Sequence, residues 1–435
     1  MALQSEQCIP TAEVAELIDL HLGDLRDPDP NWHVTDSAIS GRGVYARRDI
    51  KRGELIFREH TLLNGPTASK DTLLNTCIVC FRLLEEQPIE KVLCAAGCSL
   101  PVCVTCQQSE QHARECKLFR YWVPKDTTRI NPYSLRIVSV MRCYFLSREK
   151  RKLLLSMQAN SDKYYLREVE RAALCFENFP KDKETLGFFY RTVCVYNTNA
   201  FEGRSIVDGY ETAVRALFAL AGLMNHNCTP NASHQFADGQ TIVVTAARDI
   251  AQSEEITMTY TKILWNTFGR QLFLRATKHF ICKCKRCLDP TENGTYLSAL
   301  FCREQGCKGI VIPVETKTLQ PHWRCLTCET IFPHTKMARY QDFALNTINN
   351  RINSSTVHEL ITFINEMCPR FCPPSNYVLV EAKLNVIWRM SRLKDDFTED
   401  EMQHRDRYRA EILEILEKLG AGDCTLKKLI TNEIP

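Results

Sequence analysis

The spacing of the cysteines constrains this chain more than any other feature of its sequence. Of the 22 cysteines in 435 residues, most lie in short Cys-x-Cys, Cys-x2-Cys and Cys-x3-Cys steps. Such steps are typical of metal sites, because one tight turn presents two thiolates to the same ion. The first twenty residues carry Glu6, Glu13 and Glu16 and no continuous apolar core, so we expect no secretory signal. We therefore expect a reducing compartment and favour metal binding over a disulfide framework.

The composition excludes several classes of protein. With 44% hydrophobic and 25% charged residues, the chain is expected to be globular rather than disordered or fibrous. No apolar stretch is long enough to span a bilayer. The net charge of +3 is too small to indicate nucleic-acid binding by itself. One basic run, interrupted by Glu149, is expected to be a solvated helix face rather than a DNA-binding site; it comprises Arg142, Arg148, Lys150, Arg151 and Lys152.

Hydrophobic periodicity predicts a mixture of strands and helices. Strand patterns occupy residues 31–76 and 201–260, and helical patterns occupy residues 117–200 and the chain from about 336 onward. The β-branched, apolar run Thr241–Ala247 predicts a buried strand. Apolar residues alternate after residue 255, which predicts a further strand with Ile256, Met258 and Tyr260 on one face.

One short sequence occurs twice. The residues Arg48-Asp49-Ile50-x-x-Gly53-Glu54-x-Ile56 recur at 248–256, with Ser253 in place of the glycine. Both copies predict a strand, a tight turn and a second strand. If the turn needs a positive φ, Ser253 costs on the order of 1 kcal/mol. Chance similarity between two hairpins is the alternative.

Four pairs of metal-ligating residues lie within 40 residues of each other. They are Cys77 and Cys80, Cys94 and Cys98, Cys103 and Cys106, and His112 and Cys116. Zinc takes four sulfur or nitrogen ligands in a tetrahedron, so eight ligands predict two zinc ions. A segment this short has almost no apolar core, and metal binding would supply its folding free energy. The alternative is a set of buried free cysteines.

A later group of cysteines has the spacing of a zinc ribbon. Cys302-x4-Cys307 and Cys325-x2-Cys328 form two pairs, with Trp323 between them. The group predicts a further zinc site, and four reduced, buried thiols are the alternative.

Several separate motifs, in order, resemble one known family. They are GRGVYA at 41–46, NHNCTPN at 225–231, EEITMTY at 254–260, and Phe280 followed by Cys282-x-Cys284-x2-Cys287. Each motif alone is weak, but this order resembles a SET domain with its post-SET segment over residues 32–287. A Cys/His block inserted at 77–116 is similar to a MYND finger. The chain is therefore identified as a member of the SET-and-MYND (SMYD) family, most like its arthropod-specific branch.

The resemblance implies an α+β fold. A β-rich SET domain, with small twisted sheets and a knotted C-terminal segment, would be split by the finger and by a helical insert. The implied segments are an N-terminal helical segment at 1–30, a first SET part at 31–76, a MYND zinc finger at 77–116, a helical SET insert at 117–200, the SET core at 201–265, a post-SET zinc segment at 266–290, the zinc ribbon or thiol group at 291–335 and a helical C-terminal domain at 336–435.

The resemblance also implies an activity, the transfer of a methyl group from S-adenosylmethionine to a lysine of a histone or non-histone protein. Such a transfer needs aligned donor and acceptor, a dry site and a neutral lysine amine. Asn225 and His226 would hold the cofactor, and Tyr260 would contact it, orient the substrate amine and act as the catalytic residue. Further cofactor contacts would come from the glycine turn and two flanking residues: Gly41, Arg42, Gly43, Tyr45, Asn199 and Phe280. Taken singly, each motif also fits an ordinary turn or packing role.

The resemblance further implies how the metal ligands combine. In the finger the pairs would interleave, with Cys77, Cys80, Cys103 and Cys106 at one zinc and Cys94, Cys98, His112 and Cys116 at the other. Cys228 would complete a third zinc site with Cys282, Cys284 and Cys287, and that site would fasten the post-SET loop over the cofactor motif. Three zinc ions are expected, and four if the later cysteine group also binds one.

Two residues depart from the family pattern. Lys278 stands where active members often carry a tyrosine that walls the lysine channel, and Ser253 stands where they carry glycine. A cation in the channel would repel a protonated lysine. A weakly active or inactive adaptor, which docks a proline-containing peptide through the finger as a transcriptional co-regulator, is therefore the alternative function. We expect a monomer in the nucleus or the cytoplasm, with no membrane partner.

Overall fold

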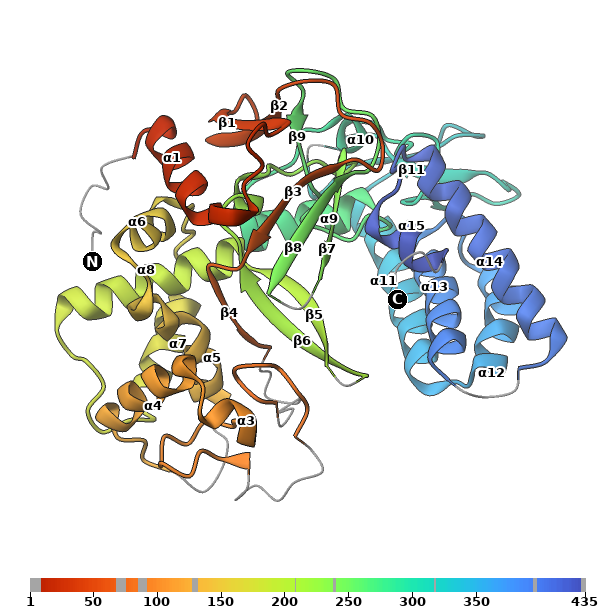
Figure 1. Ribbon diagram of the computed structural model, residues 1–435. Coiled ribbons are helices and arrows are strands. Elements are labelled where there is room, and N and C mark those ends of the chain that lie inside the picture. The colour runs from red at the N-terminus through yellow and green to blue at the C-terminus, as the bar shows by residue number, and fades with distance from the viewer. Residues whose placement is uncertain are drawn as a thin grey trace.

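The computed structural model describes residues 9–67, 76–84, 92–126, 132–207, 209–237, 240–316, 318–393 and 397–431. Small antiparallel sheets occupy its centre, with a helical group on either side (Figure 1). The expected α+β fold is confirmed. None of the helices within these residues combines the length and the apolar character needed to cross a membrane.

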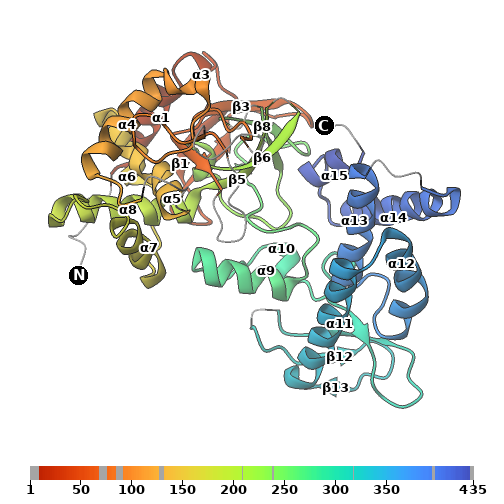
Figure 2. The same ribbon diagram turned by 90° about the horizontal axis from the view of Figure 1, so that it is seen from below.

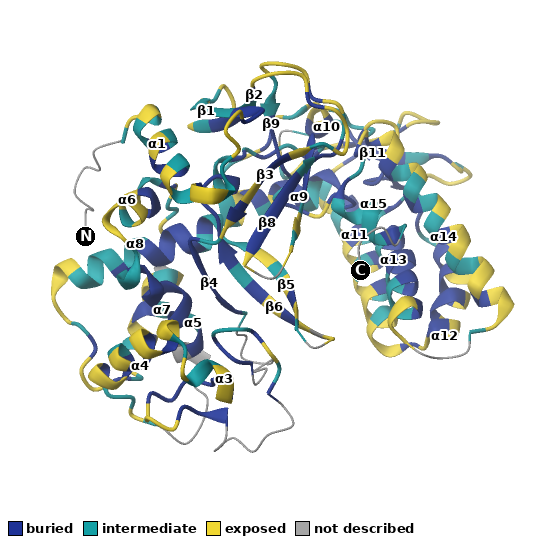
Figure 3. Ribbon diagram, viewed as in Figure 1, coloured by how far each residue is buried: buried dark blue, intermediate teal, exposed yellow. Residues whose placement is uncertain are grey.

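Segments that are far apart in the sequence form the central sheets. One sheet has the order β1-β2-β9, a second β3-β8-β7 and a third β4-β6-β5, and every pairing is antiparallel. The strands are β1 Trp32–Asp36, β2 Arg42–Ala46, β3 Leu55–His60, β4 Leu63–Pro66, β5 Phe201–Val207, β6 Tyr210–Leu217, β7 Ala232–Phe236, β8 Thr241–Ala246 and β9 Glu255–Ile256. The strand expected at Thr241–Ala247 is therefore confirmed as β8, which lies in the middle of its sheet with most of its residues buried (Figure 3).

The strand expected over Ile256–Tyr260 is mostly wrong. Only Glu255 and Ile256 form a strand, and Met258 makes a single parallel bridge with His226. The backbone of this segment instead bonds to the segment at 225–227, since Asn227 N donates to Met258 O and Met258 N donates to Asn225 O. The alternation of apolar residues therefore reflects contact with another loop rather than membership of a long strand.

Helices form two groups on opposite sides of the sheets. The first group comprises α1 Thr11–Leu22, α3 Val104–Gln107, α4 Glu110–Trp122, α5 Pro132–Met141, α6 Arg148–Ser156, α7 Lys163–Ala173 and α8 Lys183–Asn199. The second comprises α11 His334–Ser354, α12 Val357–Thr362, α13 Tyr377–Arg392, α14 Glu399–Lys418 and α15 Thr425–Ile430. Figure 2 shows α9 Thr267–Phe273 and α10 Lys285–Leu288 between the two groups.

The two copies of the repeated sequence face each other. Ile50 and Ile250 exchange both backbone hydrogen bonds at 2.9 Å. The Asp249 carboxylate accepts from Arg52 N at 2.8 Å, and the Asp49 carboxylate accepts from Gln252 N at the same distance. Each copy therefore caps the turn of the other, and this shared role explains why the same residue types occur at both positions.

The turn of each copy requires a left-handed backbone. Gly53 has a φ of 82° and Ser253 a φ of 64°. A side chain is strained in this conformation, so Ser253→Gly is expected to stabilise the protein. Its free energy of unfolding should be about 0.5–1 kcal/mol higher than that of the natural chain. Chemical denaturation measures this difference, and the m value should be the same for both proteins. Gly53→Ala serves as the control and should lower stability by about 1 kcal/mol; a destabilised Ser253→Gly would contradict the argument.

The basic run at 142–152 is only partly a solvated face. Arg148, Lys150 and Lys152 are exposed, but Arg142 is buried. Its guanidinium donates to the Glu115 carboxylate, Asn64 O and Ile78 O, each at 2.7 Å. Arg142 therefore ties α4 and the cysteine block to β4, a role that the local charge pattern did not reveal.

Candidate functional site

Two of the motifs meet at the end of β9. His226 Nδ1 accepts a hydrogen bond from the backbone N–H of Tyr260 at 2.9 Å, and the two rings are 5.2 Å apart. Burial lowers the pKa of His226 to about 3, so its ring is neutral. Since Nδ1 accepts, Nε2 carries the proton and points at Cys228 Sγ, 3.1 Å away. One imidazole therefore joins the predicted cofactor motif, the predicted catalytic tyrosine and a predicted metal ligand.

The Asn225 amide holds the glycine turn against this motif. Its Nδ2 donates to the backbone oxygens of Ser40 and Arg42, at 3.1 and 3.0 Å. Gly41 has a φ of 54°, which favours glycine. The Arg42 guanidinium points away from the turn and donates to Ser156 O and Ile9 O. Gly41, Arg42 and Asn225 are thus brought together, with the Arg42 side chain fastening the turn to its surroundings.

A carboxylate that sequence reasoning missed lies beside the glycine turn. Glu255 accepts from Ser37 Oγ at 2.8 Å, from Asn225 Nδ2 at 2.8 Å and from the Tyr45 hydroxyl at 2.9 Å. A Cβ added to Gly43 would lie 2.4 Å from Glu255 Oε1, so this contact explains the second glycine. The doubled glutamate before Ile256 was the only sequence signal, and it did not distinguish Glu255 from Glu254.

Tyr260 is anchored at its hydroxyl. The hydroxyl donates to Met224 O at 2.7 Å, and burial raises the pKa of the phenol. Tyr260 therefore remains a neutral donor at physiological pH. The Phe280 ring lies 6.0 Å from His226 and packs in the same small cluster as Tyr260.

Asn199 lies at the C-terminal end of α8. Its amide donates to Gln158 O at 2.7 Å and Val195 O at 2.8 Å. Its Cβ lies 3.9 Å from the position of a Cβ on Gly222, in the turn just before Met224. The structure therefore brings Asn199 near the NHNCTPN motif through Gly222 rather than by a direct hydrogen bond.

Lys278 lies over the predicted catalytic residue. Its Nζ is 5.5 Å from the centre of the Tyr260 ring and donates to Thr198 O at the end of α8. Burial lowers the pKa of Lys278 from 10.5 to about 8, with a further lowering by Arg215 and an opposing effect of Glu202. The ammonium thus joins three parts of the site, and it loses its charge more readily than an exposed lysine does.

The lowered pKa predicts a dependence of stability on pH. Between about pH 8 and 10.5 the unfolded chain binds more protons at this position than the folded chain, so the contribution of Lys278 to stability rises with pH in that window. The rise is at most about 3 kcal/mol. The free energy of unfolding should be measured by denaturation across this window for the natural chain and for Lys278→Met. Plotted against pH, it should rise more steeply for the natural chain. Lys150→Met, on the exposed face of α6, is the control and should follow the natural chain.

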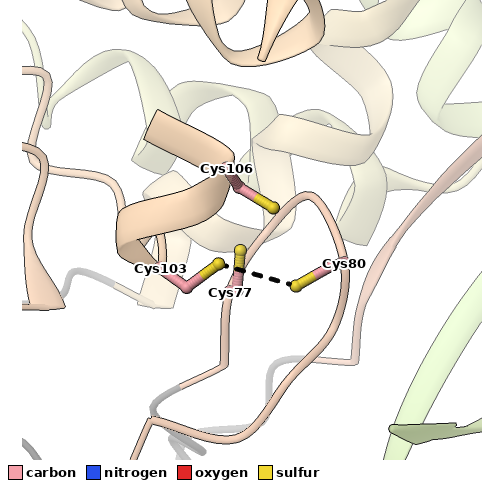
Figure 4. A group of neighbouring side chains, drawn as sticks. All are labelled: Cys77, Cys80, Cys103 and Cys106. Carbon is pink, nitrogen blue, oxygen red and sulfur yellow. Dashed lines mark hydrogen bonds between the residues drawn. The ribbon is translucent and has the colours of Figure 1, made fainter. Parts of the chain in front are cut away.

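Each predicted set of metal ligands forms one cluster. Within each set the ligand atoms lie within 4.8 Å of one another. With zinc–sulfur bonds of about 2.3 Å, a tetrahedron places two sulfurs about 3.8 Å apart. The Sγ atoms of Cys80 and Cys103 are 3.8 Å apart, as are those of Cys94 and Cys116 (Figure 4 shows the first cluster). The four residues of the first cluster and the four of the second therefore fit the predicted interleaved zinc sites.

The third cluster joins the motifs around Tyr260. Cys228 Sγ lies 3.9 Å from Cys282 Sγ and 3.4 Å from Cys287 Sγ, and Cys284 completes the group. These distances fit four ligands of one zinc ion. The cluster therefore connects Cys282, Cys284 and Cys287 to Cys228, which lies two positions after His226.

Buried charges around the third cluster support thiolate ligands. Arg270 and Arg286 are fully buried, and among the described residues their one acidic partner is the buried Glu292, at 2.7 and 3.1 Å. Arg270 Nε also donates to Cys228 Sγ at 3.2 Å. Two buried cations and one anion leave a positive charge that needs compensation. A zinc ion with four thiolates carries about two negative charges, so the surroundings fit a loaded metal site. Sequence reasoning did not identify these three residues, because nothing local marks them.

The chain is similar to proteins that contain a SET domain. A family model described as SET domain matches residues 41–261. The SET domain-containing protein SmydA-8, isoform B, of Drosophila melanogaster is 64% identical over 425 residues, which cover 98% of this chain and 95% of that protein. The human histone-lysine N-methyltransferase SMYD3 is 26% identical over 320 residues, covering 66% of this chain and 68% of that protein. A solved structure of Rubisco LSMT bound to AdoMet is 11% identical, with coverage of 97% and 96% and a TM-score of 0.31.

Proposed function

The chain belongs to the SET domain family, as one of its SET-and-MYND members, and from this premise we propose that it transfers a methyl group from S-adenosylmethionine to a lysine of a histone or non-histone protein. The single observation that carries the proposal is the convergence of Asn225, His226 and Tyr260. They come from segments that pair backbone to backbone, and the glycine turn is bonded to the same asparagine.

The residues present fit the cofactor. S-adenosylmethionine carries a sulfonium and an ammonium, and the part-buried Glu255 carboxylate lies beside the glycine turn, where a cation is favourable. The cofactor would be held by the backbone of the glycine turn, at Gly41 and Gly43, and by the side-chain amide of Asn225. The residues around these groups would be Asn199, His226 and Phe280. When bound, the cofactor supplies an electrophilic methyl group.

The protein's own share of the reaction is orientation and exclusion of water. Methyl transfer to an amine is an in-line displacement and needs an uncharged lysine, whose pKa in water is near 10.4. Tyr260 and Phe280 pack with Phe273 and Leu274, and desolvation against these apolar side chains favours the neutral amine. The Tyr260 hydroxyl, held by Met224 O, would orient the incoming nitrogen.

We propose zinc at three clusters. Two lie in the finger and would support its fold by joining separate loops of that segment, beside the buried side chains of Ile78, Val92 and Leu100. The third, at Cys228, Cys282, Cys284 and Cys287, would hold the post-SET segment against the cofactor motif. We further propose that the protein acts as a monomer in the nucleus or cytoplasm, with a protein carrying the target lysine as its partner.

One observation favours a second function. Lys278 lies 5.5 Å from the Tyr260 ring, in the region that the substrate lysine would enter. A cation there opposes an approaching ammonium, which would suit a weakly active or inactive adaptor that docks a proline-containing peptide through its finger.

Calorimetry with S-adenosylmethionine and a labelled methyl-transfer assay test the proposal together. The enzyme hypothesis expects one cofactor bound per chain and label on lysines of nuclear or cytosolic proteins. Binding without transfer at any pH between 7 and 10 would favour the adaptor. Absence of cofactor binding by a folded, zinc-loaded chain would refute the proposed use of the glycine turn.

A further inference from the structure

We propose that Cys302, Cys307, Cys325 and Cys328 bind a fourth zinc ion, and that this ion holds together a small β-ribbon outside the SET match. The ribbon follows residue 261, where that match ends. It consists of the sheet β10-β11-β12-β13, whose strands are Leu300–Phe301, Ile310–Pro313, Trp323–Cys325 and Ile331–Phe332. The proposal concerns a metal site only and does not depend on the proposed methyl transfer.

The geometry of the four thiols fits a tetrahedral ion. All four Sγ atoms lie within 4.8 Å of one another. Cys302 Sγ is 3.6 Å from Cys328 Sγ, and Cys307 Sγ is 3.7 Å from Cys325 Sγ. These distances are close to the roughly 3.8 Å edge of a zinc–thiolate tetrahedron. They are far longer than the bond of about 2.05 Å that a disulfide needs.

Backbone N–H groups point at the sulfurs. Glu304 N donates to Cys302 Sγ and Gly309 N donates to Cys307 Sγ, at 3.5 and 3.4 Å. On the other side, Thr327 N and Cys328 N both donate to Cys325 Sγ at 3.4 Å. Hydrogen bonds to sulfur favour the thiolate over the thiol, and two turns built this way present four thiolates to one point.

Glycine positions support the same turns. Gly306 has a φ of 77° between the first two cysteines. A Cβ added to Gly309 would lie 2.9 Å from Cys325 Sγ and 2.4 Å from Thr327 Oγ1. The two cysteine turns are therefore packed too closely for any larger residue at 309.

The alternative, four packing thiols, fits the surroundings less well. The ribbon core contains Cys302, Cys325 and five other buried residues, Leu300, Val311, Trp323, Phe332 and Met337. Cys328 is exposed and Cys307 is half-buried, so these two thiols contribute little apolar burial. In contrast, Cys368 and Cys372 are fully buried in the large core of the C-terminal helices. A ribbon of this size needs a metal to offset its chain entropy.

The ribbon is connected to the helical domain through its first turn. Arg303 follows Cys302, and its guanidinium lies 4.1 Å from the Tyr340 ring on α11. Met337, on the same helix, belongs to the ribbon core. Loss of the ion should therefore loosen the contact between the ribbon and α11 as well as the ribbon itself.

Metal analysis of the full chain tests the proposal. The natural chain should contain four zinc ions, and Cys325→Ser should contain three. Replacement of zinc by cobalt(II) should give tetrahedral thiolate bands that lose intensity in this variant. Cys368→Ser is the matched control: its thiol is buried but belongs to none of the metal-ligand clusters that the described residues form, so this variant should keep four ions.

A second variant guards against a folding failure. Cys328→Ser changes the exposed ligand, and it should also bind three ions while retaining the far-ultraviolet circular dichroism of the natural chain. Three ions in the natural chain, four in both cysteine variants, iron in place of zinc, or a mass lower by four hydrogens from two disulfides would each overturn the proposal. Metal counts are independent of methyl transfer, so an inactive protein with four zinc ions leaves this inference intact.

Discussion

Replacing Tyr260 with phenylalanine is expected to lower the rate of methyl transfer about 10²–10³-fold while cofactor binding changes little. The hydroxyl is the only polar group that Tyr260 presents, and Met224 O holds it at 2.7 Å. Its loss removes the group that would orient the substrate nitrogen in the transition state. Since the ring remains, packing against His226 and Phe280 should persist. Single-turnover transfer of a labelled methyl group, with calorimetry of cofactor binding, measures both quantities.

Tyr408→Phe is the matched control for this change. Tyr408 is also buried, and its hydroxyl donates to Asn365 Oδ1 at 2.9 Å in the C-terminal helical group. Both variants lose one buried hydrogen bond, worth about 1 kcal/mol of stability. Only Tyr260→Phe should lose activity. Equal activities in the two variants would show that the Tyr260 hydroxyl has a packing role alone.

Replacing Cys228 with serine is expected to remove one zinc ion per chain and to weaken cofactor binding at least about tenfold. Serine does not supply a thiolate, and without the metal site Glu292 is the one acidic partner of Arg270 and Arg286 among the described residues. Leaving buried charge without its partner costs about 3–5 kcal/mol, so the free energy of unfolding should fall by at least that amount. Zinc analysis, thermal unfolding and calorimetry with S-adenosylmethionine measure the three effects.

Cys143→Ser provides the comparison for Cys228→Ser. Cys143 is buried but belongs to no metal cluster among the described residues, so this variant should keep its zinc and lose only about 1–3 kcal/mol. If Cys228→Ser retained its full metal content and cofactor affinity, the proposed connection between the third zinc site and the cofactor motif would be wrong.

The sequence alone determined the parts of this protein whose chemistry is local. Cysteine pairs at fixed short spacings predicted the ligand clusters, because a tight turn decides which two sulfurs meet an ion. The run Thr241–Ala247 predicted a buried strand, since a continuous apolar segment cannot face water. The order of the motifs predicted the family and its α+β fold.

Only the tertiary structure decided which distant residues support the site. Glu255 bonds to three side chains from segments that are up to 218 residues away. Lys278 lies over the Tyr260 ring although the helix α9 separates the two residues in sequence. Arg270 and Glu292 compensate each other's charge beside a metal cluster. Arg142 is buried, although Arg148 and Lys150 of the same basic run are exposed. Burial and charge pairing depend on what the fold places around a residue, and a pattern along the chain carries no record of that.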